Sequence, residues 1–243
     1  MSLLVKICGL STRETLDAAL GAGADMVGFV FFPPSPRHIS FDVARELAAG
    51  VRGGARKVAL TVDADDANLS AIVTALKPDI LQLHGHESVA RILELKRKFG
   101  LEVMKALPVE TAADLAGLPD YAAVSDRILF DARPPKDATR PGGLGSTFDW
   151  HVLENLDLKR PFMVSGGLTG DNVAEALRVT RARGVDVSSS VERAPGVKDP
   201  QLIERFIRAV RATQDTMQDT MRDATQDAAQ DATQDATQDL AIR

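Results

Sequence analysis

Short apolar runs alternate with amphipathic stretches along most of the chain. The runs that we interpret as strands begin near Leu4, Met26, Val58, Ile80, Glu102, Ile128, Phe162 and Val185. Between them, apolar residues recur at helical spacing over residues 12–20, 41–49, 69–76, 88–99, 172–179 and 200–212. Eight strands that alternate with helices predict an α/β fold in which a parallel sheet closes into a (β/α)8, or TIM, barrel.

An open, doubly wound sheet of eight strands is the alternative architecture. The Gly-x-Gly-x-x-Gly turn that binds dinucleotides in such sheets does not follow the first strand, which weakens that interpretation.

Two helix-start signals support the helical segments. Ser11 and Glu14 have the spacing of a capping box, and Asp199 precedes Pro200 as a cap residue precedes a first-turn proline.

A change of composition divides the chain after residue 212. Residues 213–239 repeat a degenerate Thr-Gln-Asp-Thr/Ala unit with seven Asp, one Arg and no Glu. Few large apolar residues occur there, so this segment buries too little surface to offset its ordering entropy. We therefore expect a barrel catalytic domain over residues 1–212 and a low-complexity acidic tail, flexible or partly helical, over residues 213–243.

The tail also accounts for the charge of the protein. The formal net charge is -5, but residues 1–212 carry 27 basic and 27 acidic side chains. A neutral body has no overall attraction for nucleic acid, so we expect no such partner.

No apolar run approaches the roughly 20 residues that cross a bilayer, and no secretion signal opens the chain. We expect a cytoplasmic protein without membrane contact, and the single Cys excludes an internal disulfide.

Side chains point alternately to the two faces of a strand, and this rule sorts the strand residues by polarity. The face expected beneath the helices is aliphatic and holds Val5, Ile7, Val58, Leu60, Val62, Leu81, Leu83, Ile128, Phe130, Val185 and Val187. The face expected inside the barrel carries Lys6, Cys8, Asp63, Gln82, His84, Lys105, Asp131 and Asp186.

Two reactive side chains end strands of this set. Cys8 closes the first strand and Asp131 closes the sixth. Catalytic groups of (β/α)8 barrels lie at the carboxyl ends of strands, so we expect this thiol and this carboxyl to meet at one rim, placed for proton transfer. Lys6 precedes Cys8 by two residues on the same face, and we expect its charge to favour the thiolate.

Loops late in the chain are suited to an anion. Ser165-Gly166-Gly167-Leu168-Thr169 follows the seventh strand, and Ser188-Ser189-Ser190-Val191 follows the eighth. These are the usual positions of the phosphate site in this fold, where glycine exposes backbone N–H groups and serine adds hydroxyl donors. Gly166, Gly167, Ser188 and Ser189 are therefore the candidate phosphate-binding residues.

Two further loops complete the expected site. Residues 141–146 form a Gly-rich segment after Asp131 that we interpret as a flap over the pocket. Three prolines around Arg37 stiffen the loop after the second strand. A guanidinium restrained in this way is able to hold a carboxylate through two hydrogen bonds, which is the role we expect for Arg37.

Taken in order, these segments resemble the phosphoribosylanthranilate isomerase family of the tryptophan pathway. The matching stretches are Lys6-Ile7-Cys8-Gly9, Gly28-Phe29-Val30-Phe31, Ser35-Pro36-Arg37, Gln82-Leu83-His84-Gly85, Leu129-Phe130-Asp131, Gly142-Gly143-Leu144-Gly145, Phe148-Asp149-Trp150, the two late loops, and Pro195-Gly196-Val197-Lys198-Asp199. Each motif is weak alone, but their order over nearly all of residues 4–212 is highly specific.

The resemblance implies an Amadori rearrangement of N-(5-phosphoribosyl)anthranilate to the 1-deoxyribulose phosphate product. It places the general base on Cys8 and the general acid on Asp131, and it implies substrate contacts at Arg37, His84, Gly143 and Gly145. It also implies a small-molecule phosphosugar substrate, no metal and no organic cofactor. For the assembly we expect a monomer or a homodimer.

The chain departs from the family pattern at two positions. Asp63 stands where the family more often has Asn, and Ser190 stands where Gly is usual. Neither change removes a residue to which the resemblance gives a catalytic role.

Two other functions remain as alternatives. A related phosphosugar isomerase of histidine biosynthesis would use two Asp residues, and Cys8 in place of the first argues against it. A barrel that only binds phosphosugars would leave Cys8 as an inert core residue.

Overall fold

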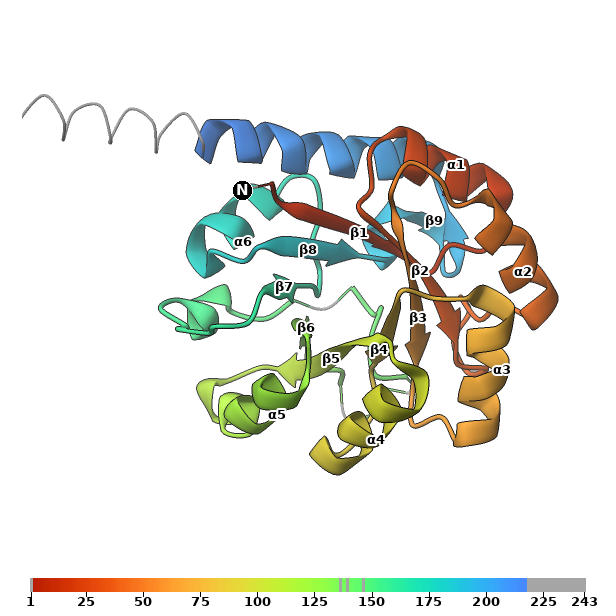
Figure 1. The fold of residues 1–243 in the computed structure, drawn as a ribbon. Helices are drawn as coiled ribbons and strands as arrows, with labels where there is room; N and C mark the ends of the chain where they lie inside the picture. Colours follow the sequence, from red (N-terminus) through yellow and green to blue (C-terminus); the bar gives the residue numbers. More distant parts are fainter. Residues whose placement is uncertain (1, 136, 139, 146, 218–243) are drawn as a thin grey trace, which may run out of the picture.

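The computed structural model describes residues 2–135, 137–138, 140–145 and 147–217. Eight parallel strands form a closed barrel in the order β1 to β8, and the helices lie around it (Figure 1). The strands are β1 (Leu4–Cys8), β2 (Met26–Phe31), β3 (Arg56–Thr61), β4 (Ile80–Leu83), β5 (Glu102–Val109), β6 (Arg127–Ala132), β7 (Phe162–Val164) and β8 (Gly184–Val187). The predicted (β/α)8 barrel is therefore confirmed.

Helices fill most connections between successive strands. They are α1 (Arg13–Gly21), α2 (Phe41–Gly50), α3 (Asp66–Leu76), α4 (Val89–Phe99), α5 (Leu118–Val124), α6 (Val173–Thr180) and a last helix that includes residues 200–217. Short 3-10 turns are η1 (Ala112–Leu115), η2 (Trp150–Leu153) and η3 (Ser189–Val191), and β9 (Glu192–Ala194) pairs with β10 (Val197–Lys198) in a small hairpin. Within the described residues, no helix is long and apolar enough to span a membrane.

All six predicted helices are present, and α5 was not predicted. It has only seven residues, which is too short for a clear apolar period. The predicted start of α1 at Ser11 is wrong, because Thr12 is the N-cap and accepts from the backbone N–H of Thr15. The start at Asp199 is confirmed, since its carboxylate accepts from the N–H of Gln201 at 2.8 Å.

Apolar layers lie on both sides of the barrel wall. The larger layer packs strand residues such as Val5 and Ile7 beneath helix residues such as Leu16 and Leu47. The smaller layer fills the barrel with side chains from β2 to β7, namely Met26, Val58, Ile80, Met104, Ala106, Leu129 and Met163. Bulky side chains inside the barrel make it a packed core rather than a pore.

The predicted orientation of β3 is wrong. Val58 lies in the inner layer, and Leu60 packs with Cys8 at the mouth of the barrel, whereas Ala59 faces the helices. Both faces of this strand are apolar or small, so alternation alone gave no direction. Here the bulky residues fill the barrel, and the small residue lies where the helices approach.

Lys105 was also assigned to the wrong face. Its neighbours Met104 and Ala106 point into the barrel, while its ammonium group lies 2.9 Å from the Glu87 carboxylate and 5.8 Å from the ring centre of Tyr121. The buried pair with Glu87 explains how a charged side chain occupies a position on the helix side.

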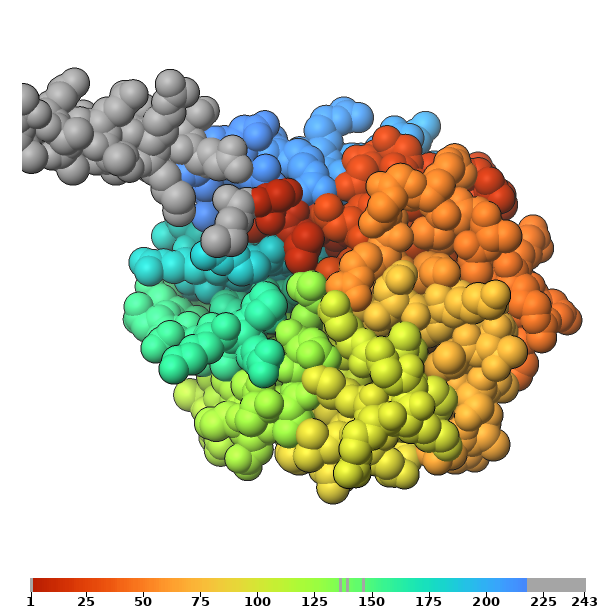
Figure 2. Space-filling model, in the orientation of Figure 1, coloured from red at the N-terminus to blue at the C-terminus, as the bar shows by residue number. Residues whose placement is uncertain are grey.

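The two ends of the described chain lie side by side, where the red first strand meets the blue last helix (Figure 2). Arg211 donates to the carbonyl of Leu3 at 2.6 Å, and the N–H of Leu3 donates to Gln214 at 2.8 Å. Met217 packs against the main apolar layer. The predicted domain boundary after residue 212 thus falls inside a helix, and most of the predicted tail lies outside the described residues.

We propose that the folded catalytic unit extends to Met217, and we expect deletion of residues 218–243 to leave the melting temperature unchanged. Deletion from residue 213 removes the bond to Leu3 and the packing of Met217, so we expect a melting temperature about 2–4 °C lower. Calorimetry of both truncated proteins beside the full chain tests this. Equal melting temperatures for the two truncations would contradict the proposed boundary.

Candidate active site

A pocket of about 800 Å³, including space open to solvent, lies at the carboxyl ends of the barrel strands. All ten residues that the sequence predicts for the site line it: Cys8, Arg37, His84, Asp131, Gly143, Gly145, Gly166, Gly167, Ser188 and Ser189. The expected convergence of Cys8 and Asp131 on one cavity is therefore present.

The thiol of Cys8 lies at the end of β1 against a glycine of β2. A Cβ on Gly28 would lie 3.1 Å from the Cys8 sulfur and 3.2 Å from Cε of Lys6, so a larger residue there would crowd both. Lys6 is fully buried and donates to both carboxylate oxygens of Asp186 at 2.9 Å. Burial is the largest influence on the pKa of Lys6 and lowers it, but the charge and hydrogen bonds of Asp186 together with those of Cys8 raise this pKa above its ordinary value.

Burial raises the pKa of the Cys8 thiol above its ordinary value. The positive charge of Lys6 lowers this pKa, as expected from the sequence, and Lys198 acts in the same direction, while Asp186 opposes them. Lys6 thus favours the thiolate, as expected, but desolvation prevails over both lysines and the pKa of the thiol stays raised. A thiol with a raised pKa is a weak acid, and its conjugate thiolate is a strong base.

The carboxyl of Asp131 faces His84 across the barrel mouth. Oδ2 of Asp131 lies 3.2 Å from Nε2 of His84, and Oδ1 accepts from the N–H of Ala132 at 3.0 Å. On its other side, Nδ1 of His84 lies 3.3 Å from the side-chain amide nitrogen of Gln82. Gly142 covers this pair from the loop after β6, because a Cβ there would lie 2.7 Å from Oδ2 of Asp131.

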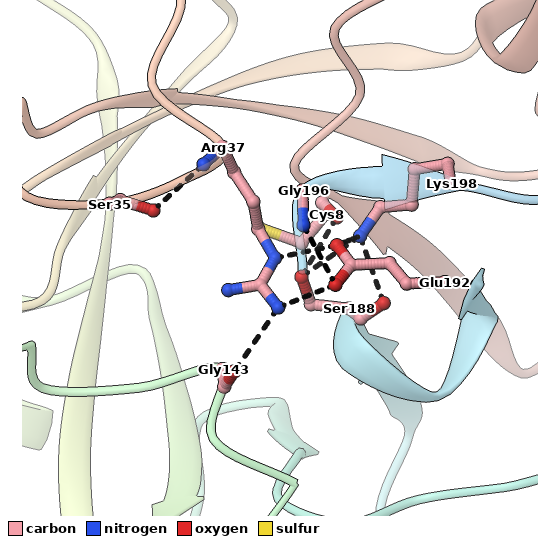
Figure 3. Close-up of polar contacts among 8 residues, drawn as sticks. All are labelled: Cys8, Ser35, Arg37, Gly143, Ser188, Glu192, Gly196 and Lys198. Carbon is pink, nitrogen blue, oxygen red and sulfur yellow. Dashed lines mark hydrogen bonds and ion pairs between the residues drawn. The ribbon is translucent and has the colours of Figure 1, made fainter. Parts of the chain in front are cut away.

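Arg37 lies in the pocket wall, but a residue of this chain already binds much of its guanidinium (Figure 3). Nε and Nη2 donate to the two carboxylate oxygens of Glu192 at 2.7 and 2.8 Å, and Nη2 also donates to the carbonyl of Gly143 at 3.1 Å. The backbone N–H of Arg37 donates to the hydroxyl of Ser35 at 3.2 Å. The loop is restrained as expected, but the carboxylate held through two hydrogen bonds belongs to Glu192.

Sequence reasoning gave no role to Glu192 and Lys198, which lie behind the pocket wall. They flank the Pro195-Gly196 turn between β9 and β10, and this hairpin spacing was the one available signal. Burial opposes ionisation of Glu192, but the hydrogen bonds from Arg37 and the charge of Lys198 keep its pKa below the ordinary value. Burial lowers the pKa of Lys198 to about 8. Arg140, which also lines the pocket, was not predicted either.

The two predicted phosphate loops lie together at one end of the pocket. Gly166 and Gly167 have φ of 83° and 62°, values that favour glycine, and the three serines Ser188 to Ser190 also line the pocket. The hydroxyl of Ser190 donates to the carbonyl of Leu168 and so joins the two loops. This contact gives a structural reason for the serine that departs from the family pattern.

The hydroxyl of Ser188 makes two hydrogen bonds to residues outside its own loop. Its hydroxyl donates to the carbonyl of Cys8 at 3.1 Å and accepts from Lys198 at 3.1 Å. The loop after β8 is thereby tied to the strand end that carries the thiol.

Asp63 does not belong to the pocket, contrary to the predicted strand face. It follows β3 with φ of 47°, and its carboxylate accepts from the N–H and faces the ring of His86 in the loop after β4. The reversed direction of β3 and the turn at Asp63 remove it from the barrel interior. The predicted flap lies over the pocket wall at Pro141–Gly145, while its last residue, Ser146, is outside the described residues.

Comparison with known proteins gives consistent results. A family model described as N-(5′-phosphoribosyl)anthranilate (PRA) isomerase matches residues 5–209. The N-(5′-phosphoribosyl)anthranilate isomerase of Bradyrhizobium diazoefficiens is 74% identical over 215 residues, which cover 88% of this chain and 96% of that protein. The phosphoribosylanthranilate isomerase of Thermotoga maritima has a crystal structure that matches with a TM-score of 0.77 and 35% identity, covering 86% of this chain and 99% of that chain.

A second solved structure of the same kind of enzyme contains a ligand. It is phosphoribosylanthranilate isomerase in complex with reduced 1-(o-carboxyphenylamino)-1-deoxyribulose 5-phosphate, and it matches with a TM-score of 0.73 and 32% identity. The match covers 86% of this chain and 99% of that chain.

We expect alkylation of Cys8 by iodoacetamide to follow a titration with its midpoint above the ordinary thiol value of 9.0, because burial disfavours the thiolate. Replacing the ion pair together, Lys6→Met with Asp186→Asn, should raise the midpoint further, since Lys6 lowers this pKa by more than Asp186 raises it. The protein has one Cys, so mass spectrometry reports this site alone. A midpoint below 9.0 in the unaltered protein would contradict the conclusion that burial affects the pKa of Cys8 more strongly than the nearby lysines do.

Proposed function

Because the chain belongs to the N-(5′-phosphoribosyl)anthranilate isomerase family, we propose that Cys8 and Asp131 are the general base and general acid of its reaction. The protein is an isomerase of tryptophan biosynthesis, which rearranges N-(5′-phosphoribosyl)anthranilate to 1-(2-carboxyphenylamino)-1-deoxyribulose 5-phosphate. The observation that carries the proposal is that these two side chains, 123 positions apart, face one pocket from the ends of β1 and β6.

In the first step Asp131 gives its proton to the ring oxygen of the ribose. The bond between that oxygen and C1′ breaks, the oxygen becomes a hydroxyl, and a protonated imine forms between C1′ and the anthranilate nitrogen. Asp131 is left as a carboxylate, and the N–H of Ala132 and the ring of His84 lie within hydrogen-bonding distance of its oxygens.

In the second step the thiolate of Cys8 removes the proton from C2′, which the adjacent imine has made acidic. The electron pair moves into a C1′–C2′ double bond and gives an enolamine. That species becomes the ketone when C1′ gains a proton and the C2′ hydroxyl loses one, so the overall reaction is an isomerisation. The buried site makes the thiolate a strong base, and Lys6 and Lys198 offset part of the cost of forming it.

The remaining pocket residues bind the substrate. The backbone of Gly166 and Gly167 and the hydroxyls of Ser188 and Ser189 would hold the phosphate. Arg37 would face the anthranilate carboxylate, and His84, Gly143 and Gly145 would contact the body of the substrate. Each of these residues lines the pocket of a single chain, which is consistent with activity as a monomer or as a homodimer.

The roles of the catalytic pair are tested with the variants Cys8→Ser and Asp131→Asn. We expect kcat to fall by about 10²–10⁴-fold in each, because each loses one proton transfer. Turnover is followed by the loss of fluorescence of freshly prepared phosphoribosylanthranilate. Calorimetric titration with the reduced product analogue should show retained binding, which separates catalysis from substrate binding. Full turnover in both variants would refute the assignment.

The role of Gly142 is tested with Gly142→Ala. The new Cβ would lie 2.7 Å from Oδ2 of Asp131 and 3.0 Å from Nε2 of His84, while the backbone itself accepts alanine. Displacing the acid by such an overlap should reduce kcat/KM by about 100-fold. Gly21→Ala is the matched control, because nothing lies within 4 Å of its Cβ and it is remote from the pocket. Equal activity of the two variants would show that Gly142 does not constrain Asp131.

A further inference from the structure

Glu192 is a buried carboxylate that no step of the proposed reaction uses. It accepts from Nε and Nη2 of Arg37, from Nζ of Lys198 at 2.6 Å, and from the N–H of Gly196 at 3.2 Å (Figure 3). Its side chain is 3% exposed, and those of Arg37 and Lys198 are 4% and 1% exposed. Burying three charges in this way costs folding free energy, because each charge loses its hydration. Removing one of the three would leave the charge of the others incompletely neutralised.

The contacts of Glu192 determine which part of Arg37 remains for a ligand. Nε and one hydrogen of Nη2 are bound by Glu192, and the other hydrogen of Nη2 faces the carbonyl of Gly143. Nη1 has no such contact with Glu192 and lies against Gly143, whose φ is 70° and where a Cβ would overlap Nη1. Gly9 packs against the aliphatic part of the same side chain. Arg37 is thus held in one orientation with Nη1 at the pocket wall.

The charge balance of this cluster points to an anion. Arg37, Glu192 and Lys198 together carry two positive charges and one negative charge, and the neighbouring pair of Lys6 and Asp186 is neutral in sum. One positive charge is therefore left over beside the pocket in a site of low dielectric. A carboxylate at Nη1 would neutralise it.

We propose that Glu192 is a specificity-determining and positioning residue: it fixes the guanidinium of Arg37 so that Nη1 meets the carboxylate of the substrate, and the pocket then prefers an aromatic carboxylate over the uncharged ring. This inference rests on the proposed role of Arg37. Lys198 restrains Glu192 from the other side through its bonds to Ser188, at 2.8 Å to the carbonyl and 3.1 Å to the hydroxyl.

The experiment compares two ligands on the whole protein by calorimetric titration. One is reduced 1-(o-carboxyphenylamino)-1-deoxyribulose 5-phosphate, and the other is the same molecule without the carboxylate. The ratio of their Kd values measures the preference for the carboxylate. We expect a clear preference in the unaltered protein and its reduction by about tenfold or more in Glu192→Gln, with the affinity for the ligand lacking the carboxylate unchanged.

Three further variants complete the test. Glu192→Asp retains the charge but is one methylene shorter, so we expect part of the preference to return. If Glu192→Gln does not fold because two cations lose their counter-charge, the double variant Glu192→Gln with Lys198→Met removes one of them, and it should show the same loss. Glu87→Gln is the matched control, since Glu87 is equally buried against Lys105 but does not line the pocket. It should lower the melting temperature and leave the preference intact.

Three results would overturn the inference. The preference for the carboxylate could be unchanged in Glu192→Gln, both ligands could weaken equally in that variant, or Glu87→Gln could lose the preference as well. A different result would refute the role of Arg37 itself: no preference in the unaltered protein, and no effect of Arg37→Met on either ligand.

Discussion

The pairing of β1 with β8 closes the sheet, and the pocket depends on that closure. Leu4 lies opposite Gly184 and Lys6 lies opposite Asp186 in this register. A Cβ on Gly184 would lie 2.7 Å from the carbonyl oxygen of Leu4, so the close approach of the two strands requires glycine. The same register brings the loop after β8 to the end of β1, where Ser188 donates to the carbonyl of Cys8. Without this pairing the thiol would have neither its charged neighbours nor the phosphate loop beside it.

The buried charges serve the site more than they serve stability. The buried pair of Lys6 and Asp186 and the cluster of Arg37, Glu192 and Lys198 replace apolar packing that would stabilise a barrel at least as well. Stability comes instead from the apolar layer between strands and helices, which is the largest cluster in the described part of the chain. The charges provide fixed positive potential beside Cys8 and at one end of the pocket, in a site that excludes much of the water that would screen it.

Much of the fold and the membership of the site followed from local sequence pattern. Eight strand starts and six helices were predicted because their apolar periods are long and regular, and strand ends located Cys8 and Asp131 without any long-range information. The directions of β3 and Lys105 were not predictable in this way. On β3 both faces are apolar, so alternation gives no direction. The charge of Lys105 is neutralised by Glu87, which lies outside the strands, so the strand pattern does not reveal the pair. The bond between Arg37 and Glu192 joins residues 155 positions apart, and only the folded barrel reveals it.

The proposed reaction requires that one bound molecule lies between Cys8, Asp131, Arg37 and the two phosphate loops. The most direct measurement is a crystal structure of this protein with reduced 1-(o-carboxyphenylamino)-1-deoxyribulose 5-phosphate. We expect the phosphate between Gly166-Gly167 and Ser188-Ser189, the carboxylate at Nη1 of Arg37, and C2′ beside the sulfur of Cys8. A ligand whose phosphate lies away from both loops, or whose C2′ lies beyond the reach of Cys8, would contradict it.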